Sequence, residues 1–273
     1  MNPSQQSITA FWLGYVPSGG KDEGPPLGDT SPVVNTVSLA FSNLFPGNVT
    51  CNGFLQKSNS EDDIRAGIAA IKAKSPDTKV ILSVIGTPNP EVGWNNGITD
   101  PTAFGQWLAY FTGDWGLDGI DIDNEDLNSN PGQPFVDTVR AMRAAMPDQM
   151  ITLDTYIFER DKDVIAELRD DLTGINTMAY FLDLASMKEL VESYATVIDP
   201  GKIWIGVKAD KVGPISQGTS LADTKALAAW NPSAGPKAGM MLWNLSSDIR
   251  AVTGEPDGAW LRGIHDNLPN GGA

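Results

Sequence analysis

The sequence predicts an α/β fold, a (β/α)8 TIM barrel built as a single domain over residues 1–273. The length suits this fold, which typically takes about 250 residues. Short apolar runs rich in β-forming residues recur roughly every 30 to 35 residues, and the segments between them carry helical spacing. Alternating strands and helices imply parallel strands, and eight such units close a barrel. The eight runs are 8–15, 34–41, 79–85, 117–123, 150–156, 174–180, 202–208 and 239–245.

The helical segments have recognisable beginnings. Ser60 and Asp63 have the spacing of a capping box, and Asp100-Pro101 reads as an N-cap followed by proline at the first helical position. The alternative fold is a doubly wound open sheet, but no G-x-G-x-x-G follows the first run, so the barrel is favoured. A barrel carries its chemistry at the carboxyl ends of its strands. We expect the Gly/Pro-rich stretch 17–32 to form one wall of that cleft.

Composition and charge exclude several function classes. The formal charge of −15 repels phosphate backbones and anionic lipids, so we expect no nucleic-acid or membrane partner and favour a neutral substrate and a monomer. Cys51 and His265 are the only cysteine and histidine, which argues against a disulfide, a Ser-His-Asp system and a metal site. We expect no cofactor. Residues 1–6 lack the features of a signal peptide, so the protein is either intracellular or had a leader removed.

The most informative segment is 116–125, GLDGIDIDNE, in which Asp121, Asp123 and Glu125 recur at every second residue. Alternate residues of a strand project to one face, so these three carboxyl groups form a row with Glu125 nearest the mouth. The interleaved Ile120 and Ile122 indicate a buried strand, where an unpaired carboxylate costs several kcal/mol. Neighbouring buried carboxyl groups raise one another's pKa, which keeps a proton donor protonated. Asp118 has the opposite parity, and we assign it a structural role.

Two other interpretations of the acidic segment are weaker. From Asp121 onward it resembles the start of a calcium loop, but Asp126 stands at the required glycine and Gly132 at the twelfth position. A solvated acidic face is the usual fate of a charge run, and the interleaved aliphatic residues argue against it.

These residues resemble family-18 glycoside hydrolases, whose fourth-strand signature is D-G-x-D-x-D-x-E. The segment 118–125 matches every fixed position. Segments of four other strands are also similar to that family: Ala40-Phe41, the run 82–86, Met178-Ala179-Tyr180 and Trp243.

The resemblance implies substrate-assisted hydrolysis with retention at a β-1,4 bond next to N-acetylglucosamine. Glu125 would protonate the leaving oxygen while the substrate's acetamide attacks the anomeric carbon. Asp123 would orient the acetamide, Asp121 would share a proton with Asp123, and Tyr180 would donate to the acetamide oxygen. The expected substrate-binding residues are Trp243 as an apolar floor, with Met178, Ser83, Trp12 and Asp183. Trp94 is a further candidate sugar platform, and Asp154 and Tyr156 close the fifth strand on the cleft side.

Three departures leave the substrate open. Ile85 precedes Gly86 where most chitinases carry two glycines, and Ser83-Val84-Ile85-Gly86 looks more like endo-β-N-acetylglucosaminidases of the endoglycosidase H type. Phe181 stands where the family has an aspartate after the sixth-strand tyrosine, and Trp243 points back toward chitinases. The first hypothesis is therefore a chitinase-like endo-hydrolase, with an N-glycan chitobiose hydrolase as the alternative. A non-catalytic lectin is the alternative of another class, and Glu125 argues against it. The family suggests a secreted protein, with the cytoplasm as the alternative.

Overall fold

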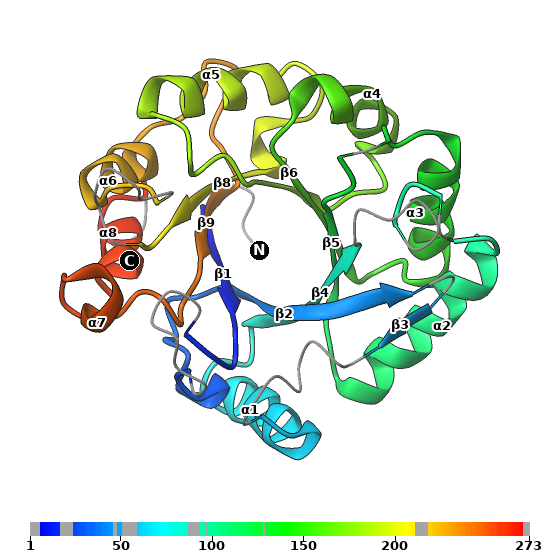
Figure 1. The fold of residues 1–273 in the computed structure, drawn as a ribbon, viewed down its shortest axis with the longest axis horizontal. Coiled ribbons are helices and arrows are strands. Elements are labelled where there is room, and N and C mark those ends of the chain that lie inside the picture. Colours follow the sequence, from blue (N-terminus) through cyan, green and yellow to red (C-terminus); the bar gives the residue numbers. More distant parts are fainter. Residues whose placement is uncertain are drawn as a thin grey trace.

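A closed barrel of eight parallel strands forms the centre of the molecule, and helices surround it (Figure 1). The computed structural model describes residues 6–16, 24–45, 48–50, 59–86, 93–96, 98–127, 129–210 and 218–269. The barrel closes because β1 pairs with both β9 and β2, and the fold class predicted from the sequence is confirmed. In chain order the strands are β1 (Ser7–Trp12), β2 (Thr36–Phe45), β3 (Asn48–Thr50), β4 (Lys79–Gly86), β5 (Gly119–Asn124), β6 (Met150–Thr155), β7 (Gly174–Thr177), β8 (Ile203–Lys208) and β9 (Gly239–Trp243).

The helices lie outside the strands, and two of their predicted starts are confirmed. Ser60 and Asp63 form a reciprocal capping box at α1, and the Asp100 side chain caps α2, which has proline in its first turn. Within the described residues no helix is both long and apolar enough to cross a membrane. The helices are α1 (Glu61–Lys74), α2 (Pro101–Trp115), α3 (Gln133–Ala145), α4 (Phe158–Leu168), α5 (Leu184–Tyr194), α6 (Leu221–Ala229), α7 (Arg250–Thr253) and α8 (Ala259–His265), with 3-10 turns η1 (Leu27–Asp29) and η3 (Pro200–Lys202).

All eight predicted runs contain a barrel strand, but several ends differ. β1 and β7 end at Trp12 and Thr177, three residues earlier than predicted. The last residue pairs with their neighbours, Trp12 with Leu39 and Thr177 with Ile205, lie at these ends. β2 runs four residues longer, past a register shift between Leu39 and Ser42, and pairs with the antiparallel β3, which sequence reasoning missed. The peptide bonds Ala40–Phe41 and Trp243–Asn244 are cis.

The Asp118-Gly119 pair at the start of β5 is structural. The Asp118 carboxylate accepts the backbone N–H of Val80 at 2.8 Å and pairs with Lys72 and Lys79, as the opposite parity predicted. A Cβ on Gly119 would lie 2.1 Å from the carbonyl oxygen of Met150 on the neighbouring strand. Only glycine allows the two backbones to approach this closely.

The interior of the barrel is divided into an apolar and a polar half. One half is a cluster of buried apolar residues that come mainly from the first two and last two barrel strands: Phe11, Leu13, Ala40, Met178, Trp204 and Met241. The other half, on β4 to β7, carries buried polar side chains in adjacent register positions: Ser83, Asp121, Thr152, Asp154 and Asn176. The carboxyl groups predicted from the sequence therefore lie in a polar sector, with an apolar wall opposite.

Candidate active site

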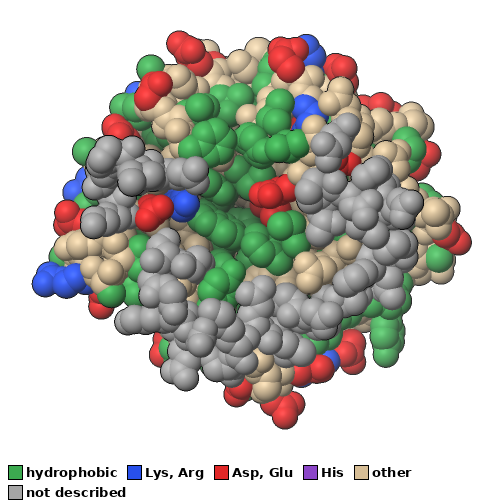
Figure 2. Space-filling view, in the orientation of Figure 1, with side chains coloured by type: hydrophobic (Ala, Val, Ile, Leu, Met, Phe, Trp, Pro, Cys, Tyr) green, Lys and Arg blue, Asp and Glu red, His purple; other side chains and the backbone are tan. Residues whose placement is uncertain are grey.

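The acidic row of β5 points into the barrel and ends at its mouth. Asp121 is 0% exposed and Asp123 is 2% exposed, whereas Glu125 follows the strand and reaches solvent. In Figure 2 acidic side chains gather in a hollow at the centre of the face, among hydrophobic side chains. The depth order predicted from strand parity is therefore the order seen in the structure.

Asp121, the deepest of the three, is surrounded by donors. Its Oδ2 accepts the Ser83 hydroxyl at 2.7 Å, and its Oδ1 accepts the Thr152 hydroxyl at 2.5 Å and the Asn176 amide at 3.2 Å. Burial raises the pKa of Asp121, and these hydrogen bonds act in the opposite direction. A buried carboxylate with three donors has replaced most of the water it lost.

Asp123 has the opposite environment. Its Oδ1 is buried and has no hydrogen-bond partner among the described residues. Burial, followed by the charges of Glu125 and Asp121, raises the pKa of Asp123 well above its ordinary value. An orphaned buried carboxyl oxygen destabilises the free protein, and a ligand donor or a proton would satisfy it.

Glu125 lies at the mouth, exposed to water yet close enough to the barrel wall to be desolvated. This desolvation raises the pKa of Glu125, while the charge of Arg160 lowers it. A carboxylic acid that stays protonated toward neutral pH and is open to solvent is suited to donating a proton to a bound substrate.

Arg160 anchors the loop that carries Glu125. Its guanidinium forms a fork with Asp161, at 2.6 and 2.8 Å, and donates to the backbone carbonyl oxygens of Asn124 and Asp126, each at 3.1 Å. The Arg160 and Asp161 side chains are both buried. Behind the loop, Asn95 holds Asp126 and Ser129 through its amide, so the Asp126 carboxylate takes part in a hydrogen-bond network of the loop.

Aromatic side chains form the opposite wall of the site. Trp243 is half-buried; its ring stacks on Phe41 and is tilted against Phe11, with ring centroids 5.5 and 5.2 Å away. Tyr180 packs against the same apolar cluster, which contains Met178. Burial, then the charges of Asp123 and Asp154, raises the pKa of Tyr180 well above its usual range, so its hydroxyl remains a donor. The structure thus brings Trp243, Met178 and Tyr180 to the barrel interior with the acidic row.

Three predicted substrate-binding residues have other contacts. The Ser83 hydroxyl is fully buried and donates to Asp121, so it supports the acidic row from below. Trp12 packs outside the barrel, because its neighbours Phe11 and Leu13 take the inward face, and its indole N–H donates to the carbonyl oxygen of Pro25 at 2.8 Å. Asp183 caps α5 by accepting the N–H groups of Ala185 and Ser186.

Two further expectations about the walls of the cleft also change. Trp94 is buried, and its indole N–H donates to the carbonyl oxygen of Val84, so it offers no sugar platform. Of the stretch 17–32, residues 17–23 lie outside the described residues, while Leu27 packs against Gly67 of α1 in the outer layer.

Sequence reasoning missed Asn176, Arg160 and a use for the exposed Phe181, and gave Asp154 only a place on the cleft side. Strand parity held a signal for Asp154 and Asn176. Asp154 alternates with Thr152 on β6 as the acids do on β5, and Asn176 lies two residues before Met178, so each pair shares a strand face. Arg160 had no such signal. Its partners in the loop lie more than 30 residues away in the sequence.

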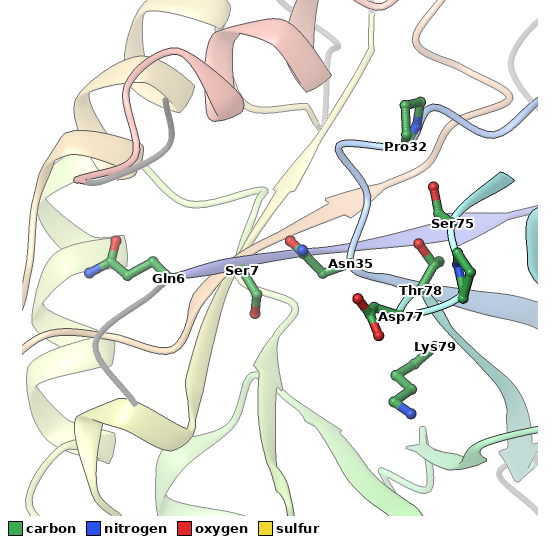
Figure 3. Close-up of a pocket in the computed structure, with 9 residues that line it drawn as sticks. Gln6, Ser7, Pro32, Asn35, Ser75, Asp77, Thr78 and Lys79 are labelled. Atoms are coloured by element: carbon green, nitrogen blue, oxygen red, sulfur yellow. The ribbon is translucent and has the colours of Figure 1, made fainter. Parts of the chain in front are cut away.

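A second cavity, of about 680 Å³, opens at the other end of the strands (Figure 3). It lies where β1, β2 and β4 begin, and its lining includes Ser7, Asn35, Thr78 and Lys79. None of the acidic row lines it. In a parallel barrel the catalytic groups stand at the carboxyl ends, so this cavity is separate from the candidate active site.

Solved structures similar to this chain are carbohydrate hydrolases. A family-18 chitinase from Pseudoalteromonas aurantia superposes with a TM-score of 0.75 at 18% identity, covering 96% of this chain and 100% of that one. A family-18 chitinase from Chromobacterium violaceum gives 0.70 at 22% identity, covering 94% and 83%. The fold is that of family-18 glycoside hydrolases.

An endo-β-N-acetylglucosaminidase from Cordyceps militaris is also similar, with a TM-score of 0.66 at 15% identity, covering 97% of this chain and 92% of that one. No protein-family model matches the chain. At these identities the likeness establishes the fold, and the resemblance seen in the sequence is confirmed at that level.

Replacing Arg160 by leucine tests its role as the anchor of the loop. We expect Arg160→Leu to lower the free energy of unfolding by about 3–5 kcal/mol, because Asp161 is left as an unpaired buried charge. Urea denaturation measures this. The control is Arg140→Leu, which removes a half-exposed arginine paired with Glu167 and should change stability by less than about 1 kcal/mol. Equal effects of the two substitutions would contradict the anchoring role.

Proposed function

We propose that this protein is a family-18 glycoside hydrolase that cleaves β-1,4 linkages next to N-acetylglucosamine with retention of configuration. The observation that carries the proposal is the complete D-G-x-D-x-D-x-E signature, residues 118–125, which places Asp121 and Asp123 inside the barrel and Glu125 at its mouth. Three chemically different carboxyl groups in one row match what substrate-assisted hydrolysis requires.

In the proposed mechanism Glu125 protonates the leaving oxygen, a role that its raised pKa favours. The substrate's acetamide oxygen acts as the nucleophile, and the unpartnered Oδ1 of Asp123 suits it to accept a hydrogen bond from the acetamide N–H. Tyr180 donates to the acetamide oxygen, and Trp243 stacks beneath the sugar ring. Asp121 holds the base of the row in place.

A chitin-type chain is the first choice of substrate, supported by the chitinases among the similar structures and by Trp243. The chitobiose core of an N-glycan is the second choice. It is favoured by Ile85, which pairs in register with Asp123 and replaces a glycine of the chitinase pattern. The endo-β-N-acetylglucosaminidase among the similar structures, solved with fucosyl-N-acetylglucosamine-Asn, supports the same choice.

Glu125→Gln tests the assignment of the proton donor. The amide keeps the shape of the side chain but cannot supply a proton, so kcat should fall by about 100-fold or more while the fold and sugar binding remain. Hydrolysis of chitooligosaccharides and release of glycans from a high-mannose glycoprotein are measured in parallel. In the wild type, kcat/KM should fall as the pH rises through the raised pKa of Glu125.

Glu159→Gln is the control, because Glu159 is an exposed acid that pairs with Lys162 at the start of α4. It should leave the activity unchanged. Full activity of Glu125→Gln would overturn the proposal, and sugar binding by a wild-type protein that hydrolyses neither substrate would favour the lectin.

Phe181 offers an aromatic face to the substrate at the mouth. It is 51% exposed and lies edge-on to Tyr156 and Tyr180, with ring centroids 5.6 and 6.2 Å apart. An exposed ring held this way suits stacking on a sugar beyond the cleavage point. Phe181→Ala should raise KM by about 3- to 10-fold with little change in kcat, as expected for a loss of about 0.5–1.5 kcal/mol of uniform binding.

The control for Phe181 is Tyr110→Ala, which removes a ring that is 73% exposed on α2. Initial rates over a range of chitooligosaccharide concentrations separate KM from kcat. A fall in kcat with no change in KM would place Phe181 in a different role.

A further inference from the structure

Asp154 is a fourth carboxyl group in the barrel interior, outside the signature. It lies on β6, is 1% exposed, and is in register with Asp123 on β5 and with Asn176 on β7. A carboxyl group buried next to two others needs a specific partner, since each charge in this sector raises the free energy of the others.

Asp154 and Asp121 share their hydrogen bonds. The Nδ2 atom of Asn176 lies 2.9 Å from Oδ1 of Asp154 and 3.2 Å from Oδ1 of Asp121, so one amide joins the two carboxyl groups. Hydrogen bonding between the two carboxyl groups lowers the pKa of Asp121 and raises that of Asp154, although burial is the largest influence on both. A hydrogen bond between two carboxyl groups requires that one of them carries a proton.

The other partners decide which of the two carries it. Asp121 accepts hydrogen bonds from Ser83, Thr152 and Asn176, and three donors stabilise its ionised form. Asp154 accepts only from Asn176 within the described part of the chain. Among the described residues, the ionisable groups that interact with Asp154 are Asp121 and Asp123 on β5 and Tyr180 toward the mouth, and none of them is a cation. The proton therefore belongs on Asp154, and burial raises the pKa of Asp154 well above its ordinary value.

We infer that Asp154 is a positioning residue that donates its proton to Asp121 and so leaves Asp123 free to bind the substrate's acetamide. Under this inference Asp121 accepts a hydrogen bond from Asp154, whereas the resemblance implies that it shares a proton with Asp123. The environment of Asp123 agrees with this inference. Its Oδ1 has no hydrogen-bond donor among the described residues, whereas both oxygens of Asp121 accept hydrogen bonds. The acetamide part of the inference rests on the proposed function, and the location of the proton does not.

Two substitutions of Asp154 test whether its side chain acts as a hydrogen-bond donor or only fills space. Asp154→Asn keeps a neutral group that donates to Asp121, so kcat should stay within about 3-fold of wild type. Asp154→Leu keeps the volume but removes the donor, so Asp121 must compete for the proton of Asp123 and kcat should fall by about 10- to 100-fold with a smaller change in KM. Equal losses in both variants would overturn the role as a donor.

The pH profile adds a readout that a merely structural role would not give. If Asp154 is already neutral, Asp154→Asn changes no charge, and the basic limb of kcat/KM should stay in place. If Asp154 were ionised, its removal would lower the pKa values of its neighbours and shift the basic limb by a unit or more to lower pH. That shift would contradict the inference.

Thermal unfolding tests whether Asp154 is protonated in the folded protein, and it requires no substrate. Such a carboxyl group has a higher pKa in the folded than in the unfolded protein, where the pKa is about 4. Between these two pKa values its destabilisation of the fold grows as the pH rises. The Tm of Asp154→Asn minus that of the wild type should therefore grow from pH 4 to pH 7. If this Tm difference does not change with pH, the inference is overturned even when the enzyme is active. If the Tm difference grows with pH but the protein hydrolyses neither substrate, the protonation of Asp154 is supported and the proposed function fails.

Asp118→Asn is the matched control for this experiment. It makes the same chemical change at the other end of the acidic strand, where the carboxylate pairs with Lys72 and Lys79. It should lower Tm, show no rising advantage between pH 4 and pH 7, and leave kcat unchanged.

Discussion

The burial of carboxyl groups inside the barrel is the constraint on which the arrangement of the interior depends. An ionised carboxylate moved out of water must find donors, a proton or a ligand, and a barrel interior has no water-filled space to spare. The two strands next to β5 therefore carry hydroxyl side chains, Ser83 and Thr152, at the register positions that face Asp121, and β7 adds the amide of Asn176. The strands across the barrel need not supply hydrogen-bond donors to these carboxyl groups, and they form the apolar wall that contains Trp243 and Met178. The division of the interior into a polar and an apolar half thus follows from one acidic strand.

The three acids of that strand differ because their surroundings change with depth. At the bottom, Asp121 is saturated with donors from three strands. In the middle, Asp123 is equally buried, but its Oδ1 has no hydrogen-bond partner within the described part of the chain. At the mouth, Glu125 meets solvent and is only partly desolvated. Similar carboxyl groups are therefore prepared for different tasks: an anchor, an acceptor or donor waiting for a ligand, and an accessible acid. The number of donors that each one meets makes this distinction, and the signature itself does not reveal it.

The sequence predicted what period and local chemistry determine, and it failed where a partner lies far along the chain. The eight strands, the capping box at Ser60 and the common face of the acidic row follow from short-range patterns. Strand parity says which residues share a face, but it does not say which face is inward. For this reason Trp12, one residue from the inward Phe11, was expected in the site and lies outside the barrel. The bond from Arg160 to the loop after β5 joins segments more than 30 residues apart, and no local pattern encodes it.

The placement of Arg160 shows how a cation can serve an acidic site without neutralising it. A guanidinium in direct contact with Glu125 would stabilise the carboxylate, lower its pKa and remove the proton that the proposed reaction needs. Here the guanidinium instead makes a two-point fork with the carboxylate of Asp161. Its remaining donors hold backbone oxygens of the loop that carries Glu125. Desolvation consequently remains the largest influence on the pKa of Glu125, ahead of the opposing charge of Arg160. The pair Arg160–Asp161 thus holds the loop that carries the acid, while the pKa of Glu125 stays above its ordinary value.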